Sequence, residues 1–459
     1  MATTNQTISV SELKHLVKGQ VIAPGDADYD QARTVFVGGI NRRPGMIVRV
    51  ADAGDVARVV TLARENGLEL AIRSGGHSSA GHSVSEGGIV LDLANLRDLK
   101  IDSQNRTAWA ETGLTAGAYT LETAKFGLAT GFGDTASVGI GGITLGGGVG
   151  YLVRKHGLTI DNLLAAEIVT ADGQLLRADN ESHPDLFWAI RGGGGNFGVA
   201  TRFQFRLHEV DMVFGGMLIL PATADVVASF MTEAESAPEE LSIIANVMTA
   251  PPLPFLPAEV HGKLIIMANM IYAGDLKDGE RAIAPFRALA EPLADMLRPM
   301  HYPEIYPPEG GDYHPISSGR TMFVDRIDRS VAETILDNLK ASTGSMAVTQ
   351  LRVLGGAMAR VSADATAFAH RQSRIMVNLA TLYQDLSEKP THEAWVANFM
   401  EAIQQSDDGA YVNFIGDEGE ARVRAAYPGG TWERLAAIKA RCDPTNLFHL
   451  NQNIPPAGK

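Results

Sequence analysis

Three short segments concentrate the glycine of this 459-residue chain, which has 48 glycines in all. They are RSGGHSSAGHS at 73–83, SVGIGGITLGGGVGYL at 137–152 and RGGGGNFGVAT at 191–201. Glycine at this density lets a backbone approach a ligand closely, and the exposed N–H groups of such loops bind phosphate oxygens. One cluster alone would be typical of a tight turn between strands. Three clusters between residues 73 and 201 favour a large phosphate-bearing ligand.

The third cluster also fits the G-x-G-x-x-G pattern of a dinucleotide-binding turn, through Gly193, Gly195 and Gly198. That turn needs a strand before it and a helix after it. Here the residues before the cluster, 183–191, have a helical pattern, and those after it, 199–207, have a strand pattern. The order is reversed, so the sequence excludes a Rossmann turn.

Strand and helix patterns alternate in the part of the chain before residue 207. Strands are predicted at 46–50, 69–76 and 87–96, and a helix with apolar residues at helical spacing at 51–67. Gly67 is expected to end that helix as its C-cap. The β-α-β order with short connections indicates an α/β or α+β domain.

Beyond residue 207 the glycine clusters stop and longer mixed segments begin. A strand is predicted at 264–274, and an amphipathic helix at 281–297 that Pro285 and Pro292 interrupt. Two proline-rich stretches lie at 251–257 and 303–315. This change in character predicts a second domain with irregular loops, a common location for substrate contacts.

Composition excludes several classes of function. The net charge of −14, from 39 Lys and Arg against 53 Asp and Glu, leaves no basic surplus to neutralise the phosphates of a nucleic acid or an anionic membrane. The single cysteine, Cys442, excludes internal disulfides and cysteine-based zinc or iron–sulfur centres. The sequence has no apolar run of about 18 residues and no visible secretory signal. We predict a cytoplasmic monomer or homodimer without nucleic-acid or membrane partners.

Six segments together resemble one family of flavoproteins. They are RSGGHS at 73–78, VGIGGITLGGGVGYL at 138–152, GLTIDNLLAAEIVTADG at 157–173, HPDLFWAIRGGGGNFGVAT at 183–201, YVNF at 411–414 and DPTNLFHLNQNIPP at 443–456. In these segments and their order, the chain closely resembles the covalent FAD-linked oxidases of berberine-bridge-enzyme type, within the wider vanillyl-alcohol-oxidase-like, PCMH-type flavoproteins. The matches run from the N-terminal part of the chain to its C-terminus.

The resemblance implies an α+β fold of two parts. A PCMH-type FAD-binding domain with two α/β subdomains would occupy residues 1–206, and an α+β substrate domain on an antiparallel sheet would be inserted at 207–405. The C-terminal segment, 406–459, would return to the FAD-binding domain. The change in character at residue 207 agrees with this division.

The resemblance also implies that His77 bonds covalently to the 8α-methyl group of FAD. Doubly linked relatives carry a cysteine just before the V-G-I-G-G segment, where this chain has Thr135. The chain therefore resembles the singly linked branch, with no cysteinyl link. His77 and His82 share a loop without a nearby acidic or cysteine partner, so no metal site is predicted. His82 could contact the flavin or be an ordinary loop residue.

The positions that match flavin-contacting positions of the family lie in the glycine clusters and near the C-terminus. Beside His77, they are Arg73, Ser74, Gly75, Gly76, Ser78, Gly81, His82, Thr135, Ser137, Val138, Gly141, Gly142, Gly147, Val199 and Asn451. Val138 stands where the family places the residue beside the flavin's oxygen pocket. A small valine there favours an oxidase, although an ordinary strand residue fits the same pattern.

Tyr411 and Asn413 are the candidate catalytic residues. Tyr411 matches the position from which several relatives supply a tyrosine base, and strand alternation would place it on one face with Asn413. An ordinary tyrosine titrates near ~10, so a base role needs a lowered pKa or proton transfer concerted with hydride transfer. A tyrosine that only packs against the flavin fits the sequence equally well.

The resemblance implies an FAD-linked oxidase. Such an enzyme would transfer a hydride from an alcohol or amine carbon of a small organic molecule to FAD and reduce O₂ to H₂O₂. A dehydrogenase with another acceptor and a flavin-binding protein without turnover are the alternatives. An aromatic and titratable cluster could line the substrate pocket or form a surface loop: His301, Tyr302, Tyr306, Tyr313 and His314.

Overall fold

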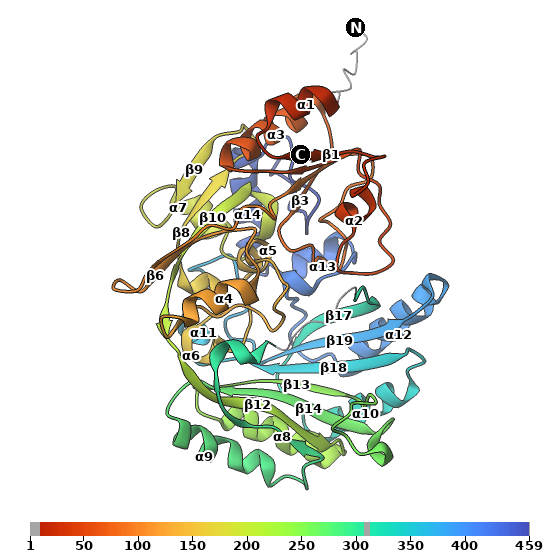
Figure 1. The fold of residues 1–459 in the computed structure, drawn as a ribbon. Coiled ribbons are helices and arrows are strands. Elements are labelled where there is room, and N and C mark those ends of the chain that lie inside the picture. The colour runs from red at the N-terminus through yellow and green to blue at the C-terminus, as the bar shows by residue number, and fades with distance from the viewer. Residues whose placement is uncertain (1–9, 307–312, 459) are drawn as a thin grey trace.

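The computed structural model describes residues 10–306 and 313–458. The N-terminal residues 1–9, on which the expectation about a secretory signal rests, and the middle of the proline-rich stretch 303–315 lie outside these ranges. Figure 1 shows a large sheet with its helices in one half of the molecule, and two smaller sheets with the C-terminal segment in the other. No helix in the described ranges is long and apolar enough to cross a membrane.

The first sheet has four strands, and its apolar runs are buried. In order across the sheet they are β1 (Gln20–Ile22), β2 (Met46–Arg49), β4 (Ile89–Asp92) and β3 (Leu70–Arg73). Strands β2 and β3 are parallel to β4, and helix α3 (Ala53–Asn66) connects β2 to β3. The Asp52 side chain caps α3 at its start, and Gly67 ends it with φ 60°. The predicted β-α-β unit and the role of Gly67 are confirmed.

The second sheet has five antiparallel strands. They are β5 (Leu99–Asp102), β6 (Thr107–Glu111), β10 (Val199–Arg206), β8 (Leu163–Val169) and β9 (Leu175–Ala178), in this order. Its core includes residues from α4 (Ala116–Ala124), α5 (Ile140–Gly146), α7 (Pro184–Ala189), α13 (Glu420–Ala425) and α14 (Thr431–Cys442). The C-terminal helices therefore share a core with the N-terminal half of the chain.

The third sheet is an eight-stranded antiparallel sheet from the middle of the chain. Its order is β15 (Ala294–Asp295), β12 (Met212–Pro221), β14 (Leu264–Tyr272), β13 (Leu241–Thr249), β18 (Met346–Val353), β19 (Ile375–Tyr383) and β17 (Ile316–Val324), and β16 (Arg298–His301) also pairs with β12. One face packs against α8 (Ala224–Ser236), α9 (Leu276–Arg287), α10 (Arg329–Ala341) and α12 (Lys389–Ile403). The other face contributes Phe323 and Met376 to a cluster with Val149 of the second glycine cluster. The predicted α+β class is confirmed.

The helix predicted at 281–297 is wrong in its extent. Helix α9 begins earlier, where the Asp275 side chain accepts the N–H groups of Lys277 and Asp278, and it ends at Arg287. Pro285 is tolerated because it lies in the last turn, whereas Pro292 cannot continue a helix and favours extended backbone before it. Residues 294–295 therefore form β15 and pair with β12.

The third glycine cluster lies between α7 and β10, as its flanking patterns predict. This order confirms that the cluster is not a Rossmann turn. The remaining elements are α1 (Val10–Leu16), α2 (Tyr29–Arg33), β7 (Leu128–Ala129), α6 (Val153–His156), η1 (Thr159–Asn162), η2 (Gly194–Asn196), β11 (His208–Glu209), η3 (Ala258–Val260), η4 (Tyr302–Ile305), α11 (Ala357–Arg360), η5 (Leu386–Glu388) and η6 (Val412–Phe414).

Candidate functional site

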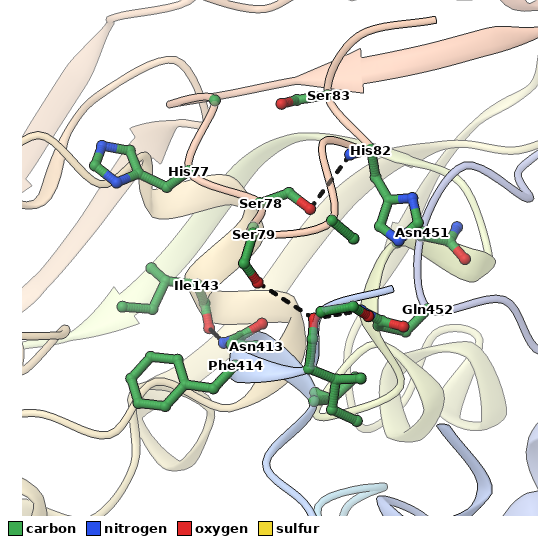
Figure 2. Close-up of a pocket in the computed structure, with 18 of the residues that line it drawn as sticks. His77, Ser78, Ser79, His82, Ser83, Ile143, Asn413, Phe414, Asn451 and Gln452 are labelled. Carbon is green, nitrogen blue, oxygen red and sulfur yellow. Dashed lines mark hydrogen bonds between the residues drawn. The ribbon is translucent and has the colours of Figure 1, made fainter. Parts of the chain in front are cut away.

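A cavity of about 820 Å³ lies where the glycine clusters meet the open face of the third sheet. We call the loops at 74–83, 133–149 and 194–200 the glycine wall; residues from all three line the cavity. We call the opposite side the sheet wall, which consists of Ser317, Ser318, Gly319, Arg320, Arg352, Asn378, Ala380, Lys389 and Glu393. C-terminal residues close the cavity between the two walls. Figure 2 shows part of the lining, from His77 to Gln452.

Close backbone approach shapes the glycine wall. A Cβ on Gly139 would overlap the Ser74 hydroxyl and the backbone nitrogen of Gly75, so these loops pack backbone against backbone. Gly142 lines the cavity, and a Cβ there would meet no atom of the described residues within 4 Å. The wall is therefore tightly packed behind its surface and open in front of it, as a cradle for a flat ligand requires.

One end of the cavity is lined by polar atoms that need a partner. Both ring nitrogens of His82, the Ser83 hydroxyl and the Asn451 side-chain oxygen are buried and have no hydrogen-bond partner among the described residues. Burial, helped by the nearby Arg42 cation, lowers the pKa of His82 to about 4, so the ring is neutral at neutral pH. Buried polar atoms without partners are costly. These atoms and the glycine cradle fit a large polar cofactor such as FAD.

His77 lies at the far end of the view in Figure 2 from His82 and Asn451. Its ring stacks on Phe36, with centroids 4.1 Å apart, and its Nε2 is hydrogen-bonded to the Ser137 hydroxyl at 2.9 Å. Thr135 lines the cavity beside it, whereas Cys442 is in α14 and is not among the described lining residues. Ring stacking and the hydroxyl contact orient the imidazole.

Most of the residues predicted to contact the flavin line this cavity. They are Ser74, Gly75, Gly76, His77, Ser78, His82, Thr135, Val138, Gly141, Gly142, Val199 and Asn451. Arg73 and Ser137 instead line an adjacent cavity of about 810 Å³, where Arg73 donates to Asp92 at 2.8 Å. Gly81 and Gly147 lie behind the surface, and a Cβ on Gly147 would lie 3.1 Å from Phe368.

Tyr411 stands in the cavity wall with its hydroxyl oxygen between two N–H donors. The backbone N–H of Gly148 and the side-chain amide of Asn413 each donate to this oxygen at 2.9 Å. Burial raises the pKa of Tyr411, and the Asn413 amide, the Gly148 N–H and the Arg352 cation oppose that rise. Two donors and a cation around one phenolic oxygen stabilise its anionic form.

The segment that carries Tyr411 is not the strand expected from alternation. Residues 412–414 form the 3₁₀ turn η6, so the predicted strand is wrong. Tyr411 and Asn413 are nevertheless neighbours, because a tight turn also brings residues two apart close together. Asn413 is held in turn by the carbonyl of Ile143, to which its amide donates at 3.1 Å.

Arg352 is a charged residue of the sheet wall that the sequence analysis missed. Arg352 is 3% exposed, and its guanidinium donates to Asp134 at 2.5 Å, to the Val149 carbonyl and to Gln350. It also lies over the Phe414 ring, 5.2 Å from the centroid. The Arg352–Asp134 pair therefore joins the two walls beside Tyr411.

The other lining residues of the third sheet were also missed. Among them, Asn378 of β19 lies directly opposite Gln350 of β18, which is two residues before Arg352 on the same strand. The alternation of the polar Gln350 and Arg352 with the apolar Leu351 and Val353 is the signal that could have indicated this face.

The predicted aromatic cluster does not line the main cavity within the described residues. Tyr302 belongs to a buried core cluster with Tyr151, and the Tyr306 hydroxyl donates to the Gly133 carbonyl at 3.2 Å. Tyr313 and His314 line the adjacent cavity, and His301 is exposed. In the described ranges, no group of three or more His, Cys, Asp or Glu residues could hold a metal ion.

Comparisons with known proteins agree with this geometry. A family model described as an FAD binding domain matches residues 44–179, and one described as berberine and berberine like matches residues 410–455. The chain is 32% identical to (R)-6-hydroxynicotine oxidase from Paenarthrobacter nicotinovorans, over 96% of this chain and 98% of the relative. It is 30% identical to an FAD-linked oxidoreductase from Dictyostelium discoideum, over 97% of each. The solved structure of 6-hydroxy-D-nicotine oxidase from Arthrobacter nicotinovorans has a TM-score of 0.85 at 28% identity, covering 95% of this chain and 98% of that one.

Proposed function

Because this chain belongs to the berberine-bridge-enzyme-like family of FAD-linked oxidoreductases, we propose that it is an oxidase of small organic molecules that reduces O₂ to H₂O₂. The family and its PCMH-type α+β fold are as the sequence predicts. The similar 6-hydroxynicotine oxidase is named an oxidase, which supports O₂ as the acceptor. The small Val138 in the cavity lining supports it too. A dehydrogenase would differ by slow reoxidation of the reduced protein in air.

In this proposal residues 1–206 and 406–459 hold FAD, and residues 207–405 contribute the substrate side. His77 bonds covalently to the cofactor, and the histidine is the single link because Thr135 has no thiol. The glycine wall lies against the flat ring system and the phosphates, and His82, Ser83 and Asn451 supply polar contacts at the other end. Bound FAD supplies the hydride acceptor of the reaction.

The surroundings of the Tyr411 oxygen carry the proposal about chemistry. Burial holds the pKa of Tyr411 above its usual value, but its two N–H donors and the Arg352 cation lower the cost of the phenolate, the form that can accept the proton of a substrate hydroxyl. Oxidation of an alcohol carbon needs such an acceptor, whereas a neutral amine can lose a hydride without one. We therefore place alcohols before amines as the substrate class, with Tyr411 as the base and Asn413 as its hydrogen-bond donor.

Tyr411→Phe tests this role of the hydroxyl. The phenyl ring keeps the packing and only the hydroxyl is lost, so the rate of flavin reduction should fall by roughly 10²–10⁴-fold while the flavin spectrum changes little. Stopped-flow reduction with an oxidisable alcohol, found from a panel of alcohols, sugars and cyclic amines by peroxide detection, measures the rate. Reoxidation by O₂ is the internal control, because it does not use the base. A reduction rate within a few-fold of wild type would favour amine oxidation.

His77→Ala tests the covalent link. The wild-type band should fluoresce as flavin on a denaturing gel, and the variant band should not, although it can still bind FAD reversibly. Peptide mapping should find a single flavin-bearing peptide. His82→Ala is the comparison, since it removes a polar contact from the same loop and keeps His77, so any flavin that this variant retains should still be covalently attached. Release of all wild-type flavin by acid precipitation would contradict the assignment.

A further inference from the structure

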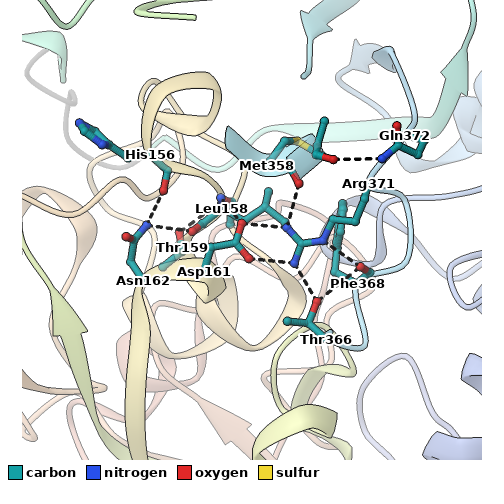
Figure 3. A network of polar contacts seen from close by, with 12 residues as sticks. His156, Leu158, Thr159, Asp161, Asn162, Met358, Thr366, Phe368, Arg371 and Gln372 are labelled. Carbon is teal, nitrogen blue, oxygen red and sulfur yellow. Dashed lines mark hydrogen bonds and ion pairs between the residues drawn. The ribbon is translucent and has the colours of Figure 1, made fainter. Parts of the chain in front are cut away.

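A largely buried ion pair, in which the Asp161 side chain is 9% exposed, joins the two halves of the molecule behind Tyr411. Arg371 is 0% exposed, and its two terminal nitrogens donate to the two carboxylate oxygens of Asp161 at 2.8 Å each. The same guanidinium donates to the Thr366 hydroxyl and to the Phe368 carbonyl (Figure 3). The planar guanidinium of Arg371 is hydrogen-bonded to groups of both segments, so it fixes the two segments relative to each other.

On the carboxylate side, this pair fixes the turn that supports one donor of Tyr411. Asp161 accepts the backbone N–H of Leu158 at 2.8 Å and so shapes the η1 turn. From that turn the backbone N–H of Thr159 donates to the Gly148 carbonyl at 3.0 Å. Gly148 in turn donates its own N–H to the Tyr411 oxygen. The position of this donor therefore depends on the turn that Asp161 holds.

On the guanidinium side, the pair fixes an aromatic ring that packs against Tyr411. Arg371 holds the Phe368 carbonyl, and its guanidinium lies over the Phe368 ring, 5.3 Å from the centroid. The Phe368 ring meets the Tyr411 ring edge to face, with centroids 6.1 Å apart. Gly147 leaves the space for this contact. One ion pair thus governs both the ring packing and a hydroxyl donor of Tyr411.

We propose that Arg371 and Asp161 are positioning residues for Tyr411, which set the direction and the acidity of its hydroxyl through Phe368 and Gly148. This inference rests on the proposed role of Tyr411 as the base. It extends that role to a pair that lies outside the cavity lining within the described residues.

Few other charged groups act on Tyr411. Arg352 faces it from β18 with Asp134 as its partner, and it opposes the rise in the pKa of Tyr411. His370 meets the Phe368 ring edge to face, and burial lowers the pKa of His370, so this imidazole is neutral at neutral pH. Neither group belongs to the Arg371–Asp161 pair, so both remain in place when the pair is broken.

Two variants that break the pair with opposite changes of charge separate position from charge. Arg371→Met removes a cation and Asp161→Asn removes an anion. A pure charge effect would move the pKa of Tyr411 up in the first variant and down in the second. Loss of the Gly148 donor would move it up in both, because that N–H stabilises the phenolate. The ultraviolet difference spectrum against Tyr411→Phe, in the same background and across pH, reports the ionisation of this one phenol.

We expect both variants of the holoenzyme to ionise at higher pH than wild type and to reduce flavin about 10- to 100-fold more slowly, as a displaced catalytic group does. Arg371→Lys keeps the cation without the fork and should shift the ionisation in the same direction by less. If the other two variants do not fold, Arg371→Lys by itself still tests the direction of the ionisation shift. Shifts of opposite sign, or no shift, would overturn the proposal.

Two further comparisons complete the test. Arg154→Met is the matched control, because Arg154 is 6% exposed and donates to the carbonyls of Ala234, Ala237 and Leu241 without touching Tyr411. It should lower stability and leave the ionisation of Tyr411 unchanged. In a Tyr411→Phe background, Arg371→Met should slow reduction little further, and an undiminished effect there would overturn the proposal. If Tyr411→Phe alone reduces flavin normally, the base assignment fails, and the ionisation shift still tests the positioning.

Discussion

The two walls of the cavity are built from different parts of the chain. The glycine wall is made of backbone, in loops that touch each other where side chains are missing. The sheet wall is made of side chains, and its three cations each have a carboxylate partner: Arg352 with Asp134, Arg320 with Glu418, and Lys389 with Glu393. A wall made of backbone suits a cofactor whose identity stays the same. A wall made of side chains can be altered by substituting one residue at a time without disturbing the fold.

The largest effect should follow from adding one methyl group to the glycine wall. In Gly139→Ala the new Cβ overlaps Ser74 and the backbone of Gly75, and backbone cannot move aside cheaply. We expect loss of bound flavin and a lower melting temperature, measured by flavin absorbance per protein and by thermal unfolding.

Gly142→Ala is the matched control for that change. Its Cβ meets open space on the cavity side, so the melting temperature of the flavin-free protein should stay near wild type while flavin loading falls. If Gly139→Ala bound as much flavin as wild type, close backbone approach would not be what forms the cradle. That result would contradict the proposed difference between the two walls.

A second, smaller effect should come from the pair that holds the third glycine cluster in place. Lys439 is fully buried and donates to Asp443 and to the carbonyls of Asn196 and Phe448. Lys439→Met leaves the Asp443 carboxylate buried without its cation, which should cost about 3–5 kcal/mol of unfolding free energy. Denaturant unfolding measures the loss. Lys439→Met combined with Asp443→Asn removes both charges and should recover part of it, and equal loss in both variants would contradict the charge argument.

The glycine wall was largely predictable from the sequence, because each of its loops is a continuous segment. The close contact of Gly75 with Gly139, and the meeting of Tyr411 with Asn413, involve residues that short motifs already single out. The flanking order of α7 and β10 was equally visible.

The sheet wall was not predictable in this way. Asp134 and Arg352 are 218 positions apart, and the strand residues that line the cavity are divided among β17, β18 and β19. Which residue reaches the cavity depends on strand register, and register in an antiparallel sheet follows from pairings that a local pattern does not specify. For the same reason the sequence does not indicate that Arg371 and Asp161 form a pair.

The smallest of these effects concerns Arg352. Its partner Asp134 has a 25% exposed side chain, so water can solvate that carboxylate when the cation is removed, unlike the fully buried Asp443. The Arg352 cation opposes the rise in the pKa of Tyr411, so Arg352→Met should raise that pKa further. Less phenolate is then present at a given pH, and flavin reduction at neutral pH should slow about 10- to 100-fold, equivalent to about 1.4–2.8 kcal/mol.

The sign of this effect gives a pH test. A base that must be deprotonated works better as the pH rises, so the rate of flavin reduction should increase toward the pKa of Tyr411 in the wild type. In Arg352→Met the same rise should move to higher pH, and Arg352→Lys, which keeps the charge, should stay near wild type. Flavin content should be unchanged in both variants, since Arg352 belongs to the sheet wall. A uniform loss of rate at every pH would show instead that Arg352 acts on substrate binding and not through the acidity of Tyr411.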